Sequence, residues 1–217
     1  MTVTDLKIYG GLLSPFVLRP VLAARAKGHE LPVESFPGGI KCDEYLALTP
    51  TGKMPLMVHG DLVLPESQPI TDYVDAVLPG PALLPADPVE AARVRLLVRI
   101  ADVYMVPHLG GLFAAQSKPE GVPAAMAGMA AALAYFEHFR DPAHDYAYGD
   151  SFTQADAAMI PLFFFLDALD RGLGTAKLLE ATPGLAAWWT RAKASDIGAR
   201  AVAEQAEGLK AMMAARG

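Results

Sequence analysis

Residues 79–85, with the sequence Pro79-Gly80-Pro81-Ala82-Leu83-Leu84-Pro85, divide this chain into two halves with different patterns. Prolines and a glycine at this density make a stiff connection without regular structure. Strand and helix signals alternate before this stretch, and only helix signals follow it. The sequence therefore predicts an α/β domain over residues 1–79, a linker over 80–87 and an all-helical domain over 88–217.

The first half reads as strand, helix, strand, an irregular stretch, two strands and a helix. These regions are residues 6–9, 15–27, 31–36, 56–58 and 62–64, and a last helix that Ser67 is expected to cap. His59-Gly60-Asp61 separates the two adjacent strands and is typical of a hairpin turn. This order predicts a small sheet covered by helices.

The second half begins with a strong helix signal. Asp87-Pro88-Val89-Glu90 supplies an N-cap, a proline at the first helical position and an acidic third residue. The helix should run past Tyr104, and Pro107 should kink or end it because proline lacks the backbone N–H. Further helices are expected near 122–140, 175–181, 184–194 and 199–215.

A second capping signal lies at Thr153-Gln154-Ala155-Asp156, where Asp156 takes the place of the usual glutamate in a capping box. The residues that follow are apolar almost all round the helix, which predicts a central buried helix. Trp188 and Trp189 are adjacent, so we expect one ring inside the domain and one near its surface.

Composition narrows the class of protein. Hydrophobic residues make up 53% of the 217 and charged residues 19%, which is typical of a packed globular protein. The net charge of −6 gives no basic surface for nucleic acid. The single cysteine, Cys42, fits a reducing compartment, and we expect a cytoplasmic protein without signal peptide or membrane span. The five histidines have no ligand spacing, so no metal is expected.

Four local features, in this order, resemble the cytosolic glutathione transferases. Ser14-Pro15-Phe16 follows the first strand, Met54-Pro55 precedes the third, Glu66-Ser67 opens the third helix, and Thr153-Gln154-Ala155-Asp156 begins a buried helix. The resemblance covers nearly the whole chain and is strongest to the serine-type, tau-like classes. It implies a thioredoxin-like N-terminal domain, a C-terminal helical bundle, and an enzyme that adds the glutathione thiolate to a small hydrophobic electrophile in detoxification.

The resemblance also implies a glutathione site. Ser14 is its expected catalytic residue, because a hydroxyl beside a helix N-terminus can donate to a thiolate. The expected glutathione-binding residues are Lys41, Lys53, Met54, Pro55, Glu66 and Ser67. In the family the Met54–Pro55 bond is cis, Glu66 and Ser67 hold the γ-glutamyl end, and the two lysines are candidates for the glycine carboxylate. Taken alone, Ser14 could also be an ordinary helix cap.

The acceptor substrate should bind beside this site. The expected residues are Leu12, Leu13, Phe16, Tyr104, His108 and Phe113. Tyr104 and His108 are one helical turn apart and could face the same cleft. Tyr104 as a core residue and His108 as a solvated one are the alternatives. Cys42 is interpreted as a bystander, because a redox site of this fold would need a cysteine at position 14.

Three functions remain open at this stage. The first is conjugation of glutathione, and the second is a glutathione-dependent isomerase, ether-cleaving or dehalogenating enzyme of the same fold. The third is a non-enzymatic binding protein, against which the presence of Ser14, Glu66 and Ser67 argues. The resemblance also implies a homodimer.

Overall fold

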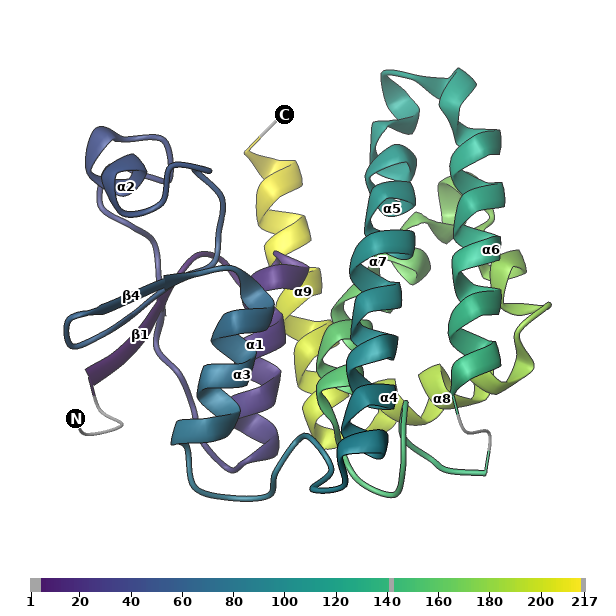
Figure 1. The fold of residues 1–217 in the computed structure, drawn as a ribbon. Coiled ribbons are helices and arrows are strands. Elements are labelled where there is room, and N and C mark those ends of the chain that lie inside the picture. The colour runs from purple at the N-terminus through teal and green to yellow at the C-terminus, as the bar shows by residue number, and fades with distance from the viewer. Residues whose placement is uncertain (1–4, 141–142, 216–217) are drawn as a thin grey trace. The chain divides into compact units, whose positions relative to one another are not determined.

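A computed structural model describes residues 5–140 and 143–215 (Figure 1). Packing groups the chain into two compact units. The first runs to Leu83 and resumes at Arg200, and the second spans Leu84–Ala199. The domain boundaries at 79 and 88 remain a prediction, but packing assigns the chain from Arg200 onward to the first unit. A helical pattern predicts a helix and does not reveal which core the helix will cover.

A four-stranded mixed sheet with the order β2-β1-β3-β4 forms the centre of the first unit. Its strands are β1 (Leu6–Tyr9), β2 (Val33–Glu34), β3 (Leu56–His59) and β4 (Leu62–Pro65). β1 runs parallel to β2 and antiparallel to β3, and β3 and β4 form the predicted hairpin. Only β2 is much shorter than expected, at two residues instead of six.

Three helices of this unit belong to its N-terminal part: α1 (Pro15–Ala26), α2 (Asp43–Leu48) and α3 (Ser67–Val77). α1 and α3 lie side by side (Figure 1). α2 occupies the stretch expected to be irregular. Its cap is Cys42, whose Sγ accepts a hydrogen bond from the Tyr45 backbone N–H at 3.4 Å. Cysteine is not one of the usual cap residues, so the sequence carried no clear start signal here.

The linker is attached to the first unit by a buried ion pair. Lys27 Nζ donates to Asp75 Oδ1 at 2.9 Å and to the Pro81 carbonyl at 2.8 Å. Asp75 also accepts the Leu83 backbone N–H at 3.1 Å. These contacts fix the backbone up to Leu83 and satisfy polar groups that burial would otherwise leave without partners.

The second unit is helical. Its helices are α4 (Pro88–Ile100), a π-helical turn (Ala101–Met105), α5 (Val106–Phe113), α6 (Val122–Phe139), α7 (Gln154–Leu173) and α8 (Pro183–Ala194), with short 3₁₀ turns at Ala114–Gln116, Pro119–Gly121 and Thr175–Leu179. The last helix, α9 (Asp196–Ala214), starts in this unit and continues into the first.

The start and the interruption of the first long helix follow the sequence. Asp87 caps α4, since its Oδ1 accepts the backbone N–H groups of Val89 at 2.9 Å and Glu90 at 3.0 Å. Pro107 does not end the helix. Instead, the chain makes a π-helical turn immediately before it, as expected where proline cannot supply an N–H to the α-helical pattern.

Asp156 organises the start of α7. Its carboxylate accepts the Thr153 backbone N–H and hydroxyl, both at 2.9 Å, which confirms the predicted capping box. It also accepts the Ala147 N–H at 2.8 Å and the Trp188 Nε1–H at 2.9 Å. Burial raises the pKa of Asp156, against the opposing effect of these donors. The first turns of α7 are buried all round, as expected.

The expectation for the tryptophans was wrong, because both rings are buried. Trp189 is only 2% exposed, and its Nε1–H donates to Asp167 at 3.0 Å. Lys193 covers the ring with its ammonium 5.3 Å from the centroid. A charged side chain lying over an aromatic ring can shield it from water. Lys193 is placed to do so because it lies four residues after Trp189 on the same face of α8.

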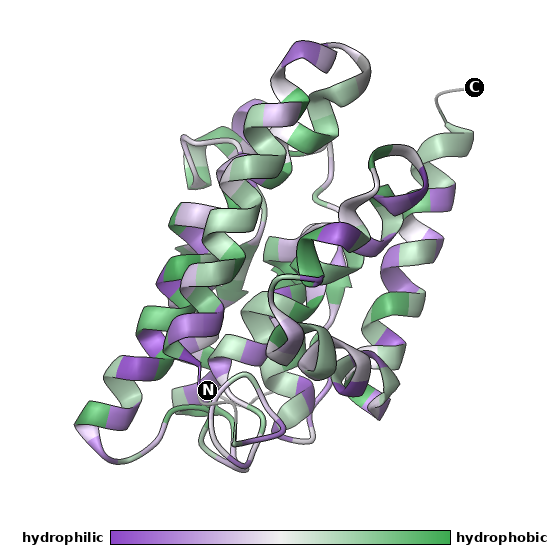
Figure 2. Ribbon diagram, turned by 90° about the vertical axis from the view of Figure 1, so that its right-hand side faces the viewer, coloured by the Kyte–Doolittle hydropathy of each residue, from purple (hydrophilic) through white to green (hydrophobic). Residues whose placement is uncertain are grey.

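The helical stretch Pro88–Phe113 is long and apolar enough to cross a membrane by length and composition alone. A core helix of a globular domain passes the same test, and α4 packs on α6 and α7 of its own unit. Hydrophilic and hydrophobic residues alternate along the long helices (Figure 2).

Candidate active site

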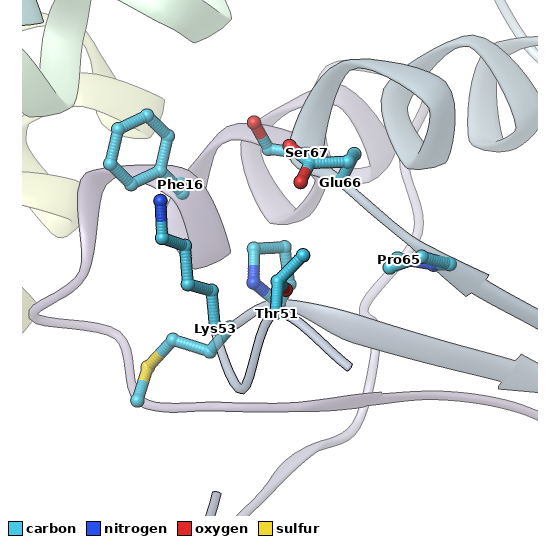
Figure 3. A pocket seen from close by; sticks show the side chains of 8 residues that line it. Phe16, Thr51, Lys53, Pro65, Glu66 and Ser67 are labelled. Atoms are coloured by element: carbon cyan, nitrogen blue, oxygen red, sulfur yellow. The ribbon is translucent and has the colours of Figure 1, made fainter. Parts of the chain in front are cut away.

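A pocket of about 130 Å³ lies at the start of α3, beside the first turn of α1 (Figure 3). Its wall comes from α1, the segment before β3, the end of β4 and the start of α3. The lining residues are Phe16, Thr51, Lys53, Met54, Pro55, Pro65, Glu66 and Ser67. Five of the six predicted glutathione-binding residues therefore meet in one cavity, although they come from two separate segments of the chain.

Glu66 has an unusual backbone in this wall. It is the one non-glycine residue with a positive φ in the described ranges, with φ 75° and ψ 126°. A side chain in that region of backbone space is disfavoured, and such strain concentrates at ligand sites. Glu66 occupies the N-cap position of α3 and has an exposed side chain, which Figure 3 shows at the rim of the pocket.

Ser67 is the first residue of α3, so its expected role as the helix cap was wrong by one position. The residue is buried, its hydroxyl borders the pocket, and its carbonyl accepts the Thr71 hydroxyl at 2.8 Å. A serine is a common cap and a glutamate with positive φ is rare, which explains the misplacement. The start of α3 thus presents a hydroxyl and the positive end of the helix dipole to the pocket.

Met54 and Pro55 form the floor beside β3, and the bond between them is cis, as predicted. The residue before them, Lys53, is held through its backbone. The Tyr45 hydroxyl, on a fully buried side chain of α2, donates to the Lys53 carbonyl at 2.7 Å. Burial raises the pKa of Tyr45, which keeps the phenol protonated and able to donate. The side chain of Lys53 is exposed, and its nitrogen extends toward the ring of Phe16 (Figure 3).

Lys41 differs from Lys53 in its surroundings. Its Nζ donates to the Gly52 carbonyl at 2.9 Å, and the residue is not part of the pocket wall among the described residues. Gly52 has φ 56°, a backbone conformation that favours glycine, and an added Cβ would lie 2.9 Å from the Lys41 Nζ. In the structure, Lys41 thus supports the turn that precedes Lys53.

Ser14 lies at the N-cap of α1, after a tight turn in which its N–H donates to the Gly11 carbonyl at 2.9 Å. Within the described chain its side chain makes no capping hydrogen bond. Ser14 is half-buried and outside the pocket wall, but Phe16 lies two residues further along α1 and borders it. The hydroxyl therefore stands at a helix N-terminus close to the pocket with no structural task as a cap.

The residues expected at the acceptor site have several different surroundings. Phe16 lines the pocket just described, whereas Leu12 and Leu13 belong to the turn before Ser14 and are half-buried. In the second unit, Tyr104 is 47% exposed and contacts Tyr135 edge-on, with ring centroids 5.6 Å apart. Tyr104 is therefore not a core residue of this unit.

His108 and Phe113 lie on α5 and make defined contacts. The imidazole of His108 packs on Gly128 of α6, so closely that an added Cβ there would be 2.1 Å from the ring. Phe113 is half exposed and contacts Phe165 of α7 edge-on, with centroids 4.9 Å apart. The assignment of these residues to an acceptor site stays a prediction.

Cys42 and the histidines are the remaining side chains that could form a redox or metal centre. The Cys42 thiol caps α2 and donates weakly to the Pro37 carbonyl at 3.6 Å. Its interpretation as a bystander stays a prediction. In the described part of the chain, no group of three histidine, cysteine, aspartate or glutamate side chains is arranged to hold a metal ion. The expectation that the protein needs no metal remains a prediction.

Two wall residues, Thr51 and Pro65, were not among those expected from the sequence. Thr51 shares a hydrogen bond with the Thr49 hydroxyl at 3.1 Å, and Pro65 ends β4 immediately before Glu66. Thr51 could have been suspected because it lies two residues before Lys53. Pro65 carried no such signal, since a proline at the end of an edge strand has an ordinary structural reason.

A thioredoxin-like sheet with a pocket beside a cis-proline, joined to a helical unit, defines the fold class of glutathione-binding transferases. Family models agree: the glutathione S-transferase N-terminal domain matches residues 8–82, and the C-terminal domain matches residues 100–196. The chain belongs to the glutathione S-transferase family. It is an enzyme of the transferase class.

Relatives are similar over most of the chain. A probable glutathione S-transferase GSTU6 of Oryza sativa subsp. japonica is 31% identical over 94% of this chain and 91% of its own. Glutathione S-transferase 3 of Zea mays is 32% identical over 85% and 87%. The crystal structure of a tau-class glutathione S-transferase of mango, Mangifera indica L., is 28% identical, covers 96% of this chain and 99% of its own, and has a TM-score of 0.80.

Proposed function

We propose that this transferase binds glutathione with its γ-glutamyl end in the pocket at the start of α3. Complementary charge supports this orientation. The Glu66 carboxylate can attract the γ-glutamyl ammonium, while the Ser67 hydroxyl and the α3 N-terminus suit its carboxylate. The pocket has a volume of about 130 Å³, small against the roughly 300–1,000 Å³ typical of a whole ligand site. It therefore suits one end of a tripeptide.

The remainder of the tripeptide would leave the pocket past Met54 and Lys53. Lys53 offers a cation for the glycine carboxylate, because its exposed ammonium borders the cavity. Lys41 is the weaker candidate of the two, since its ammonium already donates to the Gly52 carbonyl. The Met54 backbone would pair with the cysteinyl peptide in the manner of an added strand.

The second part of the proposal is that Ser14 donates a hydrogen bond to the glutathione sulfur and holds it as a thiolate. The observation that carries it is the position of this hydroxyl: at the N-cap of α1, two residues before Phe16 of the pocket wall, and without a capping bond in the described chain. In an ordinary cap serine, the side-chain oxygen accepts a hydrogen bond from a backbone N–H of the first helical turn.

The energies are sufficient for this role. Lowering a thiol pKa from about 8.5 to about 6.5 needs about 2.7 kcal/mol. A helix N-terminus supplies roughly 0.3–1 kcal/mol, and about 2 in favourable geometry. A hydrogen bond to a charged group supplies roughly 1.5–3 kcal/mol. The helix end alone is therefore marginal, and the hydroxyl makes the difference.

Thiolate formation explains only a small part of the rate. At pH 7 the thiolate fraction would rise from roughly 3% to about 75%, about 25-fold. Nucleophilicity falls with pKa at a slope of about 0.4–0.5, which removes roughly tenfold of that gain. Most of the acceleration must come from placing a hydrophobic electrophile against the sulfur. Leu12, Leu13, Tyr104, His108 and Phe113 are our candidates for that acceptor site.

Ser14→Ala tests the proposed activation. In the variant, the pKa of enzyme-bound glutathione, followed by the ultraviolet absorbance of the thiolate, should return toward about 8.5. Turnover at neutral pH should fall by at least the roughly two- to threefold that thiolate formation gains. The matched control is Ser67→Ala, which removes a hydroxyl from the pocket wall. It should raise KM for glutathione and leave the pKa of the bound thiol unchanged. An unchanged thiol pKa in Ser14→Ala would exclude Ser14 from activation.

The reaction type is part of the same proposal. We favour conjugation, and assays of an aryl halide, a maleyl isomerisation substrate and a β-aryl ether side by side would separate it from isomerisation and ether cleavage. We also propose a cytoplasmic homodimer, supported by the family resemblance and by the free thiol of Cys42, which suits a reducing compartment. Sedimentation and cell fractionation test these two points.

A further inference from the structure

The C-terminal part of α9 touches the turn that carries Ser14, and both belong to the first unit. Gly208 makes the closest contact. A Cβ added at this glycine would lie 2.9 Å from the Leu13 Cβ and 3.5 Å from the Leu13 backbone N and Cα. Carbon atoms without a bond between them do not approach so closely at rest. Only a glycine at position 208 therefore allows α9 to lie where it does.

Gln205 makes a second contact with the same residue. Its side chain is fully buried, and its Nε2 donates to the Leu13 carbonyl at 3.4 Å. Residues 205 and 208 are three apart and so lie on the same face of the helix. One face of α9 thus meets Leu13 twice, through the side chain of Gln205 and at the backbone of Gly208.

Four charged side chains hold α9 in this position. The Arg25 guanidinium of α1 binds both oxygens of Glu204, at 2.7 and 2.8 Å, and its side chain is only 7% exposed. Arg200 donates to Glu204 at 3.1 Å and to Glu30, just after α1, at 3.0 Å. We call Arg25, Glu30, Arg200 and Glu204 the α9 latch. Hydrophilic and hydrophobic residues both occur along α9, the helix that leads to the label C in Figure 2.

The geometry of the turn connects these contacts to Ser14. The Ser14 N–H donates to the Gly11 carbonyl at 2.9 Å, so Leu12 and Leu13 are the two central residues of a four-residue turn. Leu13 is bonded directly to Ser14. A shift of Leu13 therefore moves the Ser14 backbone and redirects its hydroxyl. In catalysis, a displacement of about 1 Å can cost on the order of 100-fold in rate.

We propose that Gly208 and Gln205 of α9 are positioning residues for Ser14, held in register by the α9 latch. The inference rests on the proposed role of Ser14 in thiolate formation. Neither side chain needs to touch glutathione. Their function is to fix Leu13, so that the next hydroxyl along the chain points to the sulfur.

Gly208→Ala is the main test. Because its methyl group would press on Leu13, we expect the pKa of bound glutathione to rise, and kcat at neutral pH to fall by about the two- to threefold that loss of the thiolate costs. KM for glutathione should change less than twofold, because the pocket wall comes from α1, α3 and the β3–β4 region. The matched control is Gly172→Ala, in the last turn of α7, where an added Cβ meets no atom of the described chain within 4 Å.

Gln205→Met provides a second variant in case Gly208→Ala does not fold. It keeps the length of the side chain and removes the donor to the Leu13 carbonyl. We expect the same pattern as for Gly208→Ala, with a smaller rise in the thiol pKa. A folded Gly208→Ala or Gln205→Met variant with unchanged thiol pKa and kcat would overturn the inference.

The two proposals fail in different ways. If Ser14→Ala raises the thiol pKa and Gly208→Ala does not, Ser14 keeps its role and only the positioning by α9 is refuted. If Ser14→Ala leaves the thiol pKa unchanged, the proposed activation itself is refuted. A rise of the thiol pKa in Ser14→Ala and in Gly208→Ala, but not in Gly172→Ala, supports both.

Discussion

Replacing Asp156 by alanine should remove a large part of the stability of the helical unit. The carboxylate accepts three N–H donors, from the backbones of Ala147 and Thr153 and from the indole of Trp188. All three donors belong to buried residues, so the variant would leave them without their partner and shielded from water. The Thr153 hydroxyl would lose a fourth bond.

The expected loss follows from these bonds. A buried donor without its partner costs about 1–3 kcal/mol, so three of them at the lower half of that range cost about 3–6 kcal/mol. Removing a buried carboxylate, whose pKa is raised by burial, recovers part of this amount. We therefore expect the free energy of unfolding to fall by about 3–4 kcal/mol. Whole domains are stable by about 5–15 kcal/mol.

Denaturant titration, monitored by tryptophan fluorescence, measures the unfolding of the second unit, which contains Asp156. The chain has two tryptophans, Trp188 and Trp189, and both lie in the second unit. Asp156→Asn, which keeps the size of the side chain and one acceptor oxygen, should lose less, about 1–3 kcal/mol. Asp170→Ala is the matched control, since this aspartate near the other end of α7 accepts one exposed N–H, from Ala176 at 2.7 Å.

A fall in the free energy of unfolding of less than about 1 kcal/mol in Asp156→Ala, the scale of one exposed hydrogen bond, would contradict this prediction. An equal loss in Asp170→Ala and Asp156→Ala would contradict it as well. In either case, the four bonds to the carboxylate would not be what stabilises the start of α7.

Two further predictions concern charged side chains. Burial raises the pKa of Glu30, but the hydrogen bond from Arg200 and the charge of Arg25 outweigh it and hold that pKa below its ordinary value of 4.5. Glu30 therefore stabilises the fold above that pH, and its contribution is lost as the pH falls through the lowered value. Melting temperatures of the natural protein and Glu30→Gln should differ at neutral pH and converge in acid; a constant difference would contradict this. Lys53→Ala should raise KM for glutathione several-fold, whereas Lys41→Ala should raise it less, and steady-state kinetics showing equal effects would refute the distinction.

Several elements could be predicted because local chemistry determines them. The hairpin around Gly60 needs a turn residue that tolerates positive φ, and the sequence supplies it. The capping box at Thr153 and Asp156 depends on two residues three positions apart. That Met54 and Glu66 line one pocket could be expected from the family resemblance, because the family's strand order brings these two segments together.

Other features depend on contacts between distant residues and were missed for that reason. Trp189 donates to Asp167 of α7, 22 positions earlier in the chain, a contact that its own neighbourhood in sequence does not suggest. The bond from Tyr45 to the Lys53 carbonyl needs α2, whose cysteine cap gave no start signal. The attachment of α9 to the turn at Leu13 joins residues almost two hundred positions apart, a distance that no periodicity spans.

The return of α9 to the first unit has a consequence for biosynthesis. Residues up to Leu83 leave the ribosome early, but the helix from Arg200 that completes their packing is made only after all of Leu84–Ala199. In the nascent chain, the Leu13 turn and Arg25 therefore lack their contacts with α9 while the second unit forms. Truncation before α9, by a premature stop or by proteolysis, would remove packing contacts from the N-terminal part of the chain, although that part is synthesised first.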